Sequence, residues 1–382
     1  MTEKSQRLRL LHLHSSFAAG GKELRAAKLM NAFDPRIDHT VISAVPGEIG
    51  AAAAVDRGIA VSYPDDFPAL SGRPFPRRLL GVARAMLGHD LVLTYNWGAM
   101  DAVMAHTLFA EALSLPPLIH HEDGFNQDEA HKLKASRNVY RRLALARAQG
   151  LVVPSQRLEE IARTEWHQPR RMVHRVANGI PVSAYGGKPR PDALPRLIKR
   201  DGEAWLGTLA GLRAIKNLPR LVRAFAGLPT HWQLVILGEG PERDAIRAEA
   251  DRLGVADRVH LPGFVGDPAK ALGLFDLFAL SSDSEQFPIS VVEAMASRLA
   301  VVSPRVGDVA AMVAAENAPF ITPAGDETAL ADALSRLAAD PAARQAIGKA
   351  NRARAEAEYD EAAMVAAYRR IYGGALGRAT FP

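Results

Sequence analysis

The stretch that decides the fold is residues 8–33, LRLLHLHSSFAAGGKELRAAKLMNAF. Its first seven residues form a short apolar run that is typical of a buried strand. Residues 15–21 are mostly small and end in two glycines, and residues 22–33 carry a helical pattern. A strand, a glycine loop and a helix in this order predict the opening of a doubly wound α/β domain.

The same alternation continues outward from this opening. Further strands are expected over residues 40–44, 91–95, 117–121 and 150–154, with helical stretches between them. A segment rich in Gly, Pro and charge begins at residue 186 and is interpreted as a linker. The alternation then restarts, with strands expected over residues 205–210, 233–237, 258–261, 276–281, 300–303 and 319–322. Helices are expected over residues 218–226, 242–253, 267–274, 289–297 and from 327 to about 372.

The chain is therefore expected to be an α/β protein of two Rossmann-like, doubly wound domains. We place the first at residues 1–185, the second at 186–360 and a terminal helix at 361–382. Ligands of such sheets bind at the carboxyl ends of the strands, so a cleft between the two domains is the expected site.

Composition limits the class of protein. The chain has 382 residues, of which 48% are hydrophobic and 23% charged, as in soluble globular proteins. It has no cysteine, which excludes disulfides, thiolate metal sites and a cysteine nucleophile. Because we find neither a signal peptide nor a run of about 20 apolar residues, we expect a cytoplasmic protein.

The net charge of +5 indicates an anionic partner. Residues 130–158 contain no acid but seven cations: Lys132, Lys134, Arg137, Arg141, Arg142, Arg147 and Arg157. Leu133, Tyr140, Leu143 and Leu145 are interleaved with them. One interpretation is a solvated helix face, and the other is peripheral contact with an anionic membrane at its inner face. A nucleic-acid partner is not expected.

The strongest chemical signal is residues 281–296, SSDSEQFPISVVEAMA. An expected strand ends at residues 281–282, a polar loop carries Glu285, and a helix begins after Pro288 with Glu293 inside it. Amides at a helix start attract anions, so a diphosphate suits this position. Two carboxylates flanking the helix start can accept hydrogen bonds from sugar hydroxyls.

This segment resembles the E-x7-E signature of retaining GT-B glycosyltransferases of family 4. The resemblance covers most of the chain and is strongest over residues 205–310. It implies that Glu285 holds the donor sugar and Glu293 the ribose. It further implies a donor-binding role for the residues between them, Phe287, Pro288, Ile289 and Ser290, and a C-terminal helix that crosses back to the first domain.

Other segments of the second domain match the family in order. Residues 211–218, GLRAIKNL, resemble the loop whose Arg and Lys bind the donor diphosphate. Lys216 matches the Lys, whereas Gly211 stands where the family has Arg, and Arg213 is the alternative. The turn containing Glu239 and the turn containing Phe264 and Val265 resemble donor-binding turns, the second of which reads the nucleotide base.

In the first domain, Gly21 resembles the glycine loop near the donor phosphates. Residues 120–124, HHEDG, end an expected strand, where relatives place a His close to the reacting sugar. We favour His121 as the catalytic residue, and assign His120 and Asp123 to acceptor binding. Asn96, at the end of another strand, is a further acceptor candidate.

The resemblance implies transfer of a sugar from a nucleoside-diphosphate sugar to an acceptor hydroxyl with retention of configuration. The acceptor is expected to be a glycan or a lipid-linked sugar in bacterial cell-surface polysaccharide or glycolipid synthesis. Neither a cofactor nor a metal is expected, since no Asp-x-Asp pair is present and Lys216, Arg213 and helix amides can stabilise the diphosphate. The alternatives are a sugar-nucleotide 2-epimerase and a non-catalytic sugar-nucleotide-binding subunit.

Overall fold

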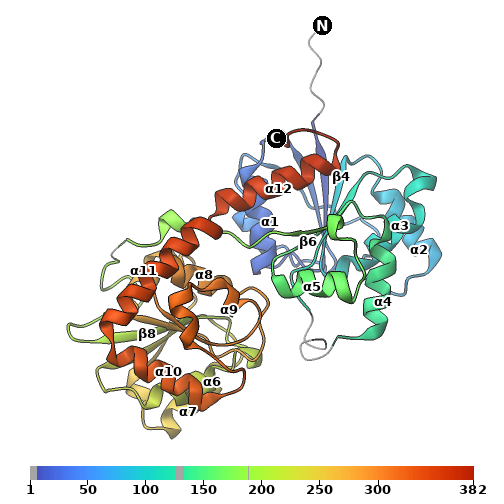
Figure 1. Cartoon of the computed structure of the whole chain (residues 1–382). Helices are drawn as coiled ribbons and strands as arrows, with labels where there is room; N and C mark the ends of the chain where they lie inside the picture. Colours follow the sequence, from blue (N-terminus) through green and yellow to red (C-terminus); the bar gives the residue numbers. More distant parts are fainter. Residues whose placement is uncertain (1–6, 126–128, 130–132, 188) are drawn as a thin grey trace. The chain divides into compact units, whose positions relative to one another are not determined.

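The computed structural model describes residues 7–125, 129, 133–187 and 189–382. The chain divides into two compact units, one of residues up to 177 together with 364–382, the other of residues 178–363 (Figure 1). The sequence-based boundary falls later, after Tyr185. Residues 178–185 belong to the second unit because Ile180 bridges to Asp360 and the Tyr185 hydroxyl donates to Glu293 at 3.0 Å.

The first unit is built on a seven-stranded parallel sheet with the strand order β3-β2-β1-β4-β5-β6-β7. Its strands are β1 (Arg9–His14), β2 (Asp38–Ser43), β3 (Ala60–Ser62), β4 (Leu91–Tyr95), β5 (Leu118–His121), β6 (Gly150–Val153) and β7 (Val173–Arg175). The four expected strands beside β1 are present. Strands β3 and β7 have three residues each, too few for a recognisable hydrophobic period, and the sequence did not predict them.

The helices of the first unit form two layers. They are α1 (Gly21–Ala32), α2 (Pro76–Ala85), α3 (Met100–Leu113), α4 (Ala135–Ala144) and α5 (Gln156–Thr164), joined by α12 (Glu361–Ala375). Helices α1 and α12 share one core cluster with β1, and helices α2, α3 and α5 share another. Tyr368 and Tyr372 of α12 are fully buried in the first unit, so the last helix completes this domain.

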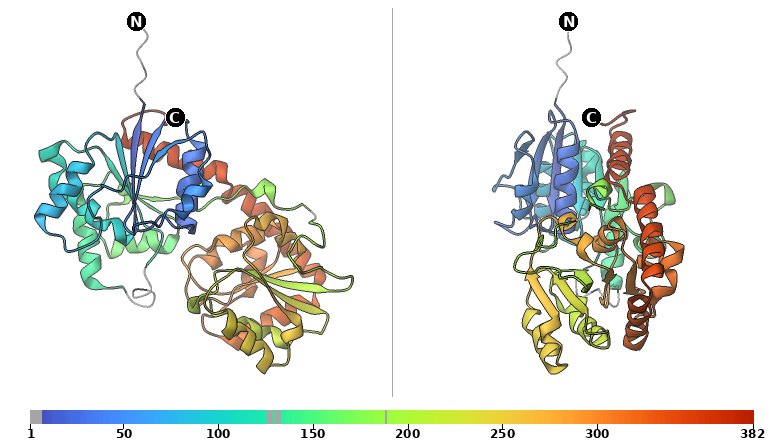
Figure 2. Two further views of the ribbon diagram at one scale, coloured as in Figure 1. Left: turned by 180° about the vertical axis from the view of Figure 1, so that it is seen from behind. Right: turned by 90° about the vertical axis from the view of Figure 1, so that its left-hand side faces the viewer.

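The second unit is a six-stranded parallel sheet with the order β10-β9-β8-β11-β12-β13. Its strands are β8 (Ala204–Leu209), β9 (Trp232–Leu237), β10 (Val259–Gly263), β11 (Leu277–Ala279), β12 (Val301–Pro304) and β13 (Ile321–Thr322). Its helices are α6 (Leu218–Ala226), α7 (Arg243–Arg252), α8 (Ile289–Ala296), α9 (Val309–Met312), α10 (Glu327–Ala339) and α11 (Pro341–Glu358). Figure 2 shows that each sheet is flanked by helices on both faces.

Two expected elements of the second unit were wrong in detail. The helix expected over residues 267–274 is instead two short 3-10 turns, Pro268–Lys270 and Leu272–Leu274. Gly273 disfavours a continuous α-helix there, because glycine has a low helix propensity. The strand expected from residue 319 begins only at Ile321, because residues 315–320 form a 3-10 turn. Residues 327 to about 372 are helical as expected, in the three helices α10, α11 and α12. Asp340 separates the first two, because its side chain accepts from Ala343 N at 2.9 Å as the N-cap of α11.

Candidate functional site

The second unit brings Lys216 and Glu285 into direct contact. Lys216 Nζ lies 2.5 Å from Glu285 Oε1, and Ser282 Oγ donates to the same oxygen at 2.7 Å. The Glu285 side chain is 10% exposed and that of Lys216 is 24% exposed, so solvent reaches both but screens them little. The two residues are 69 positions apart in the chain, and the fold makes them one charged centre.

Two loops are tied together to position this pair. Ser281 Oγ donates to the backbone oxygen of Lys216 at 2.9 Å, and Asp283 N donates to Ile215 O at 2.9 Å. Arg220, on α6, pairs with Asp283 at 2.7 Å. These bonds join the loop after β8 to the loop after β11 at the carboxyl ends of neighbouring strands, where ligands of parallel sheets bind.

Glycines allow the chain to pack closely around these loops. A Cβ on Gly238 would lie 1.9 Å from Ala210 O, and one on Gly240 would lie 2.4 Å from Leu212 O. Both glycines have positive φ. A third glycine, Gly307, has φ +51, and a Cβ there would lie 2.7 Å from Glu285 O and 2.5 Å from the next carbonyl. The loop that carries Glu285 therefore rests directly on Gly307.

The start of α8 lies just beyond Glu285. Pro288 precedes the helix and no described side chain caps it, so among the described residues the amides of Ile289 and Ser290 open the helix without a side-chain acceptor. The side-chain oxygen of Gln286 is buried and has no hydrogen-bond partner within the described chain. Phe287 packs edge-on against Tyr359, with ring centroids 5.7 Å apart. The free helix amides make a binding position for an anionic ligand, whereas the unpaired Gln286 oxygen is an acceptor that suits a hydroxyl donor.

Glu293 occupies a separate position on α8. Its carboxylate accepts from the Tyr185 hydroxyl at 3.0 Å, and burial, reinforced by this carboxylate, raises the pKa of Tyr185. Tyr185 therefore stays a neutral hydrogen-bond donor. The structure does not join Glu293 to Lys216, and its contact with Tyr185 was not foreseen from the sequence.

The remaining donor candidates lie on exposed loops of the second unit. Arg213 is exposed and begins the short turn that carries Lys216. Glu239 pairs with Arg243 at 3.3 Å. Phe264 is 75% exposed and Val265 half-buried, just after β10. An exposed phenylalanine at a loop tip is available for stacking against a planar ligand.

In the first unit, His121 is part of the core. It is 1% exposed, its Nδ1 lies 3.1 Å from Thr94 O, and its Nε2 lies 2.9 Å from the Tyr372 hydroxyl. Burial, reinforced by Arg25, lowers the pKa of His121 to about 3, so the ring is neutral. Both nitrogens are engaged within the protein. The structure thus gives His121 a role in docking α12, and its catalytic assignment stays a prediction.

The acceptor candidates lie around the same strand ends. His120 is fully buried, with Nδ1 2.8 Å from Thr94 Oγ1 and Nε2 3.7 Å from Glu122. Asn96 Oδ1 accepts from Asp123 N at 2.8 Å, which joins the ends of β4 and β5. Arg25 of α1 pairs with Asp123 at 2.8 Å. Burial favours the neutral form of Asp123, but Arg25 outweighs it and lowers the Asp123 pKa.

The glycine loop opens α1 as expected, with Gly21 as its first residue. The adjacent Lys22 and Glu23 form an ion pair, and Glu23 is buried. Burial lowers the pKa of Lys22 to about 8. A Cβ on Gly20 would lie 2.6 Å from Glu23 Oε2. The loop is therefore followed by a partly buried charged pair. The sequence did not reveal this pair, because only the glycines of the loop indicated a binding role.

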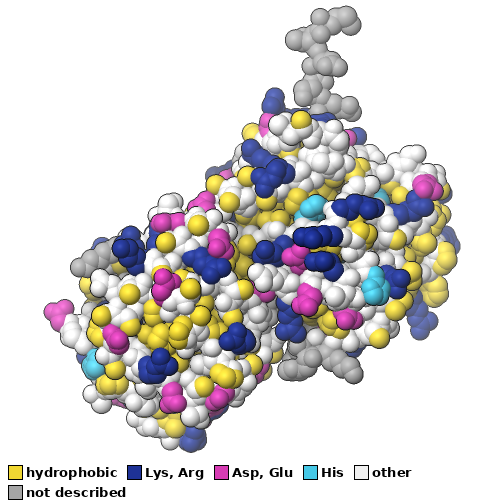
Figure 3. All heavy atoms as spheres, viewed as in Figure 1, with side chains coloured by type: hydrophobic (Ala, Val, Ile, Leu, Met, Phe, Trp, Pro, Cys, Tyr) yellow, Lys and Arg dark blue, Asp and Glu magenta, His cyan; other side chains and the backbone are white. Residues whose placement is uncertain are grey.

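The basic segment is only partly a surface feature. Arg141 is fully buried between Glu122 and Glu129, at 3.3 and 3.2 Å, and Leu145 is in the core. Tyr140 donates to Asp101 at 2.6 Å, and Arg137 pairs with Glu129 at 2.9 Å. Lys132 lies outside the described residues. The exposed apolar residues of α4 are Val139 and Leu143. On the face seen in Figure 3, Lys and Arg side chains are interspersed with hydrophobic and acidic ones.

No group of three or more His, Asp or Glu side chains in the described part of the chain is arranged to hold a metal ion. No described helix has the length and apolarity needed to cross a bilayer.

Residues 190–354 match the family model described as glycosyl transferases group 1. The chain is 26% identical over 207 residues to N-acetyl-alpha-D-glucosaminyl L-malate synthase of Bacillus anthracis, covering 54% of each chain. It is 25% identical over 327 residues to the putative glycosyltransferase EpsF of Bacillus subtilis, covering 77% of this chain and 78% of the relative. The alignment to the first of these relatives thus spans about half of its length. These matches support the expected group 1 glycosyltransferase relationship, chiefly over the second unit.

The fold also has solved counterparts. The crystal structure of Anabaena Alr3699/HepE in complex with UDP aligns with a TM-score of 0.79 and 21% identity, covering 96% of this chain and all of the other. Sucrose-phosphate synthase from Thermosynechococcus elongatus aligns with a TM-score of 0.76 and 20% identity, covering 97% of this chain. At this identity the likeness shows the fold, two Rossmann-like domains of the GT-B class, as expected from the sequence.

Proposed function

We propose that this protein is a retaining glycosyltransferase that moves a sugar from a nucleoside-diphosphate sugar to an acceptor hydroxyl. The observation that carries the proposal is the contact of Lys216 with Glu285 beside the start of α8, within the segment that matches the group 1 family model. The names of the first relatives refer to cell-surface and small-molecule glycoside synthesis. We therefore propose a bacterial surface glycan or glycolipid as the acceptor class.

The proposed chemistry is stabilisation of the leaving diphosphate. Negative charge builds on the diphosphate as its bond to the sugar breaks. A lysine ammonium and helix amides fixed beforehand at that position lower the barrier, because they need no reorganisation during the reaction. Lys216 and the amides of Ile289 and Ser290 have these roles, with Arg213 as a second cation.

The two glutamates divide the recognition of the donor. Glu285, held by Lys216 and Ser282, would accept hydrogen bonds from the sugar hydroxyls, and Glu293, held by Tyr185, from the ribose. Because Lys216 and these amides can carry the diphosphate charge, we propose that the reaction needs no metal. The acceptor is proposed to bind the first unit near Asn96 and Asp123.

Nucleotide binding tests the donor half of this proposal. UDP and GDP should raise the melting temperature of the wild type, by an amount that grows with nucleotide concentration. Lys216→Ala should weaken that binding about tenfold or more, since it removes a charged contact to the diphosphate. Lys349→Ala, an exposed lysine of α11, is the matched control. Equal binding by Lys216→Ala and the wild type would contradict the assignment.

A further inference from the structure

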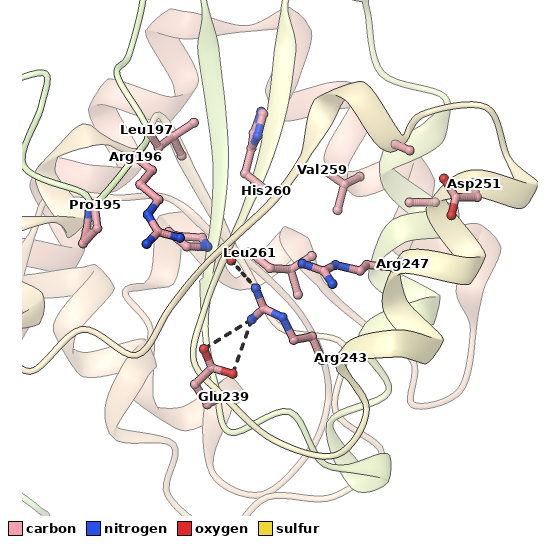
Figure 4. A pocket seen from close by; sticks show the side chains of 13 residues that line it. Pro195, Arg196, Leu197, Glu239, Arg243, Arg247, Asp251, Val259, His260 and Leu261 are labelled. Carbon is pink, nitrogen blue, oxygen red and sulfur yellow. Dashed lines mark hydrogen bonds and ion pairs between the residues drawn. The ribbon is translucent and has the colours of Figure 1, made fainter.

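A pocket of about 620 Å³ lies in the second unit, outside the proposed diphosphate position. It runs beside the edge strand β10, between α7 and the turn at residues 194–197 (Figure 4). Its charged and polar lining consists of Arg196, Arg243, Arg247, Glu239, Asp251 and His260. Neither Lys216 nor Glu285 lines it, so the pocket is separate from the Lys216–Glu285 centre, and Glu239 is the one donor candidate that it shares.

Arginines dominate the charge of this pocket. Figure 4 shows the side chains of Arg196, Arg243 and Arg247 entering it from the turn and from α7. Arg243 pairs with Glu239 at 3.3 Å and donates to Leu261 O at 2.8 Å. The side chains of Arg196 and Arg247 make no hydrogen bond or ion pair to the described residues. Two guanidinium groups therefore face the pocket with their charge unmatched.

The acidic residues of the lining offset only part of this charge. Glu239 is already shared with Arg243, and Asp251, one helical turn after Arg247 on α7, is exposed and forms no ion pair with the described residues. His260 Nε2 lies 2.9 Å from Gln233 Oε1, and burial lowers the His260 pKa, so its ring is neutral. The lining is left with a net positive charge.

The backbone also accepts an unfavourable conformation to present Arg196. Leu197 N donates to Leu194 O at 3.3 Å, which closes a four-residue turn with Pro195 second and Arg196 third. Arg196 has φ +60. Proline followed by a positive φ is the pattern of a type II turn, whose third position favours glycine. An arginine there costs on the order of 1 kcal/mol relative to glycine.

We propose that this pocket binds a phosphate-bearing small molecule at a site distinct from the donor diphosphate. Planar guanidinium groups match the oxygens of a phosphate and hold them through paired hydrogen bonds. The volume lies within the range of small-molecule sites, which accommodates a sugar phosphate as well as free phosphate. Arg243 links the site to the loop of Glu239, so a bound phosphate contacts the same side chain that fixes this loop.

Titration with inorganic phosphate and with glucose 1-phosphate, followed by calorimetry at constant ionic strength, tests the proposal. The wild type should bind saturably, and Arg196→Ala/Arg247→Ala should bind at least about tenfold more weakly. Both arginines are exposed, so this variant should keep the wild-type melting temperature. Arg252→Ala/Lys349→Ala, which removes the same charge elsewhere in the second unit, should bind as the wild type does.

Two further titrations separate this site from the proposed donor site. Lys216→Ala should retain phosphate binding while losing UDP binding, and Arg196→Ala/Arg247→Ala should do the opposite. Tighter binding of glucose 1-phosphate would identify a phosphate ester as the ligand, and equal binding would identify free phosphate. The proposal is overturned if the wild type binds neither compound, if the double variant binds normally, or if Lys216→Ala abolishes phosphate binding.

Discussion

Glu285 shows how one carboxylate is held ready by its neighbours. Its Oε1 accepts from both Lys216 and Ser282, which fixes the side chain without a ligand. We predict that Glu285→Gln lowers kcat/KM for sugar transfer about 100-fold, since two charged hydrogen bonds weaken together. Ser282→Ala, which removes only the neutral donor, should lower it less than Glu285→Gln. Steady-state kinetics measure both, and wild-type turnover by Glu285→Gln would refute the role.

A second residue-scale prediction concerns Gly307, which supports the Glu285 loop. Gly307→Ala should reduce stability by about 1–3 kcal/mol and displace the loop, because its Cβ would lie 2.5 Å from Gln286 O. Gly325→Ala is the matched control, since Gly325 also has a positive φ but no atom within 4 Å of its Cβ. Urea denaturation and donor affinity should both change more for Gly307→Ala. Equal effects of the two substitutions would mean that the positive φ alone causes the loss, and would contradict the role of Gly307 in supporting the Glu285 loop.

At the scale of single elements, buried histidines hold strands and helices together in the neutral form: His121 contacts Tyr372 of α12, and His39 of β2 contacts His12 of β1. Burial lowers the pKa of His121 to about 3 and that of His39 to about 4, below the value of about 6.5 expected for an unfolded chain. The unfolded chain therefore binds more protons between these values. The stabilisation is fully present above about pH 6.5 and is lost as the pH falls toward 4 and 3.

We therefore predict that the unfolding free energy falls between pH 6.5 and 5, by up to about 1.4 kcal/mol per pH unit for each buried histidine. Urea denaturation across this range measures the slope. The slope of the unfolding free energy against pH measures how many protons are taken up on unfolding. His121→Gln should reduce this uptake by about one proton, whereas His167→Gln, at an exposed position, should leave the slope unchanged. A slope that His121→Gln does not alter would show that another group governs acid stability.

Strong hydrophobic patterns in the sequence were sufficient to predict most helices and strands. The strands that the sequence missed were missed for physical reasons. Runs such as residues 91–95 are wholly buried and mark central strands by composition alone. Strands β3 and β7 lie at the sheet edges and are too short for a period. At the site, the motif identified Glu285 and Lys216. It could not reveal Tyr185, Gln286 or Gly307, whose roles arise from contacts between distant segments.

At the scale of the whole molecule, membrane contact remains a proposal, and the structure changes which residues of the basic segment are the best candidates for it. Several cations of the basic segment are paired, so the exposed side chains of α4, Val139, Arg142 and Leu143, are the better candidates. We predict that the wild type sediments with anionic vesicles at low salt, because each cation near such a surface contributes about 1 kcal/mol. Val139→Ser/Leu143→Ser should reduce sedimentation, and Leu108→Ser on α3 should not. Failure of the wild type to sediment would favour a solvated face.

The central claim is that the Lys216–Glu285 centre transfers a sugar with retention and without a metal. The most direct measurement is proton NMR of turnover with UDP- and GDP-sugars, an acceptor panel and excess chelator. The account predicts release of the nucleoside diphosphate, a product whose anomeric signal keeps the donor's configuration, and loss of both in Glu285→Gln. An inverted product, turnover only after magnesium or manganese is restored, or unchanged turnover in Glu285→Gln would contradict it.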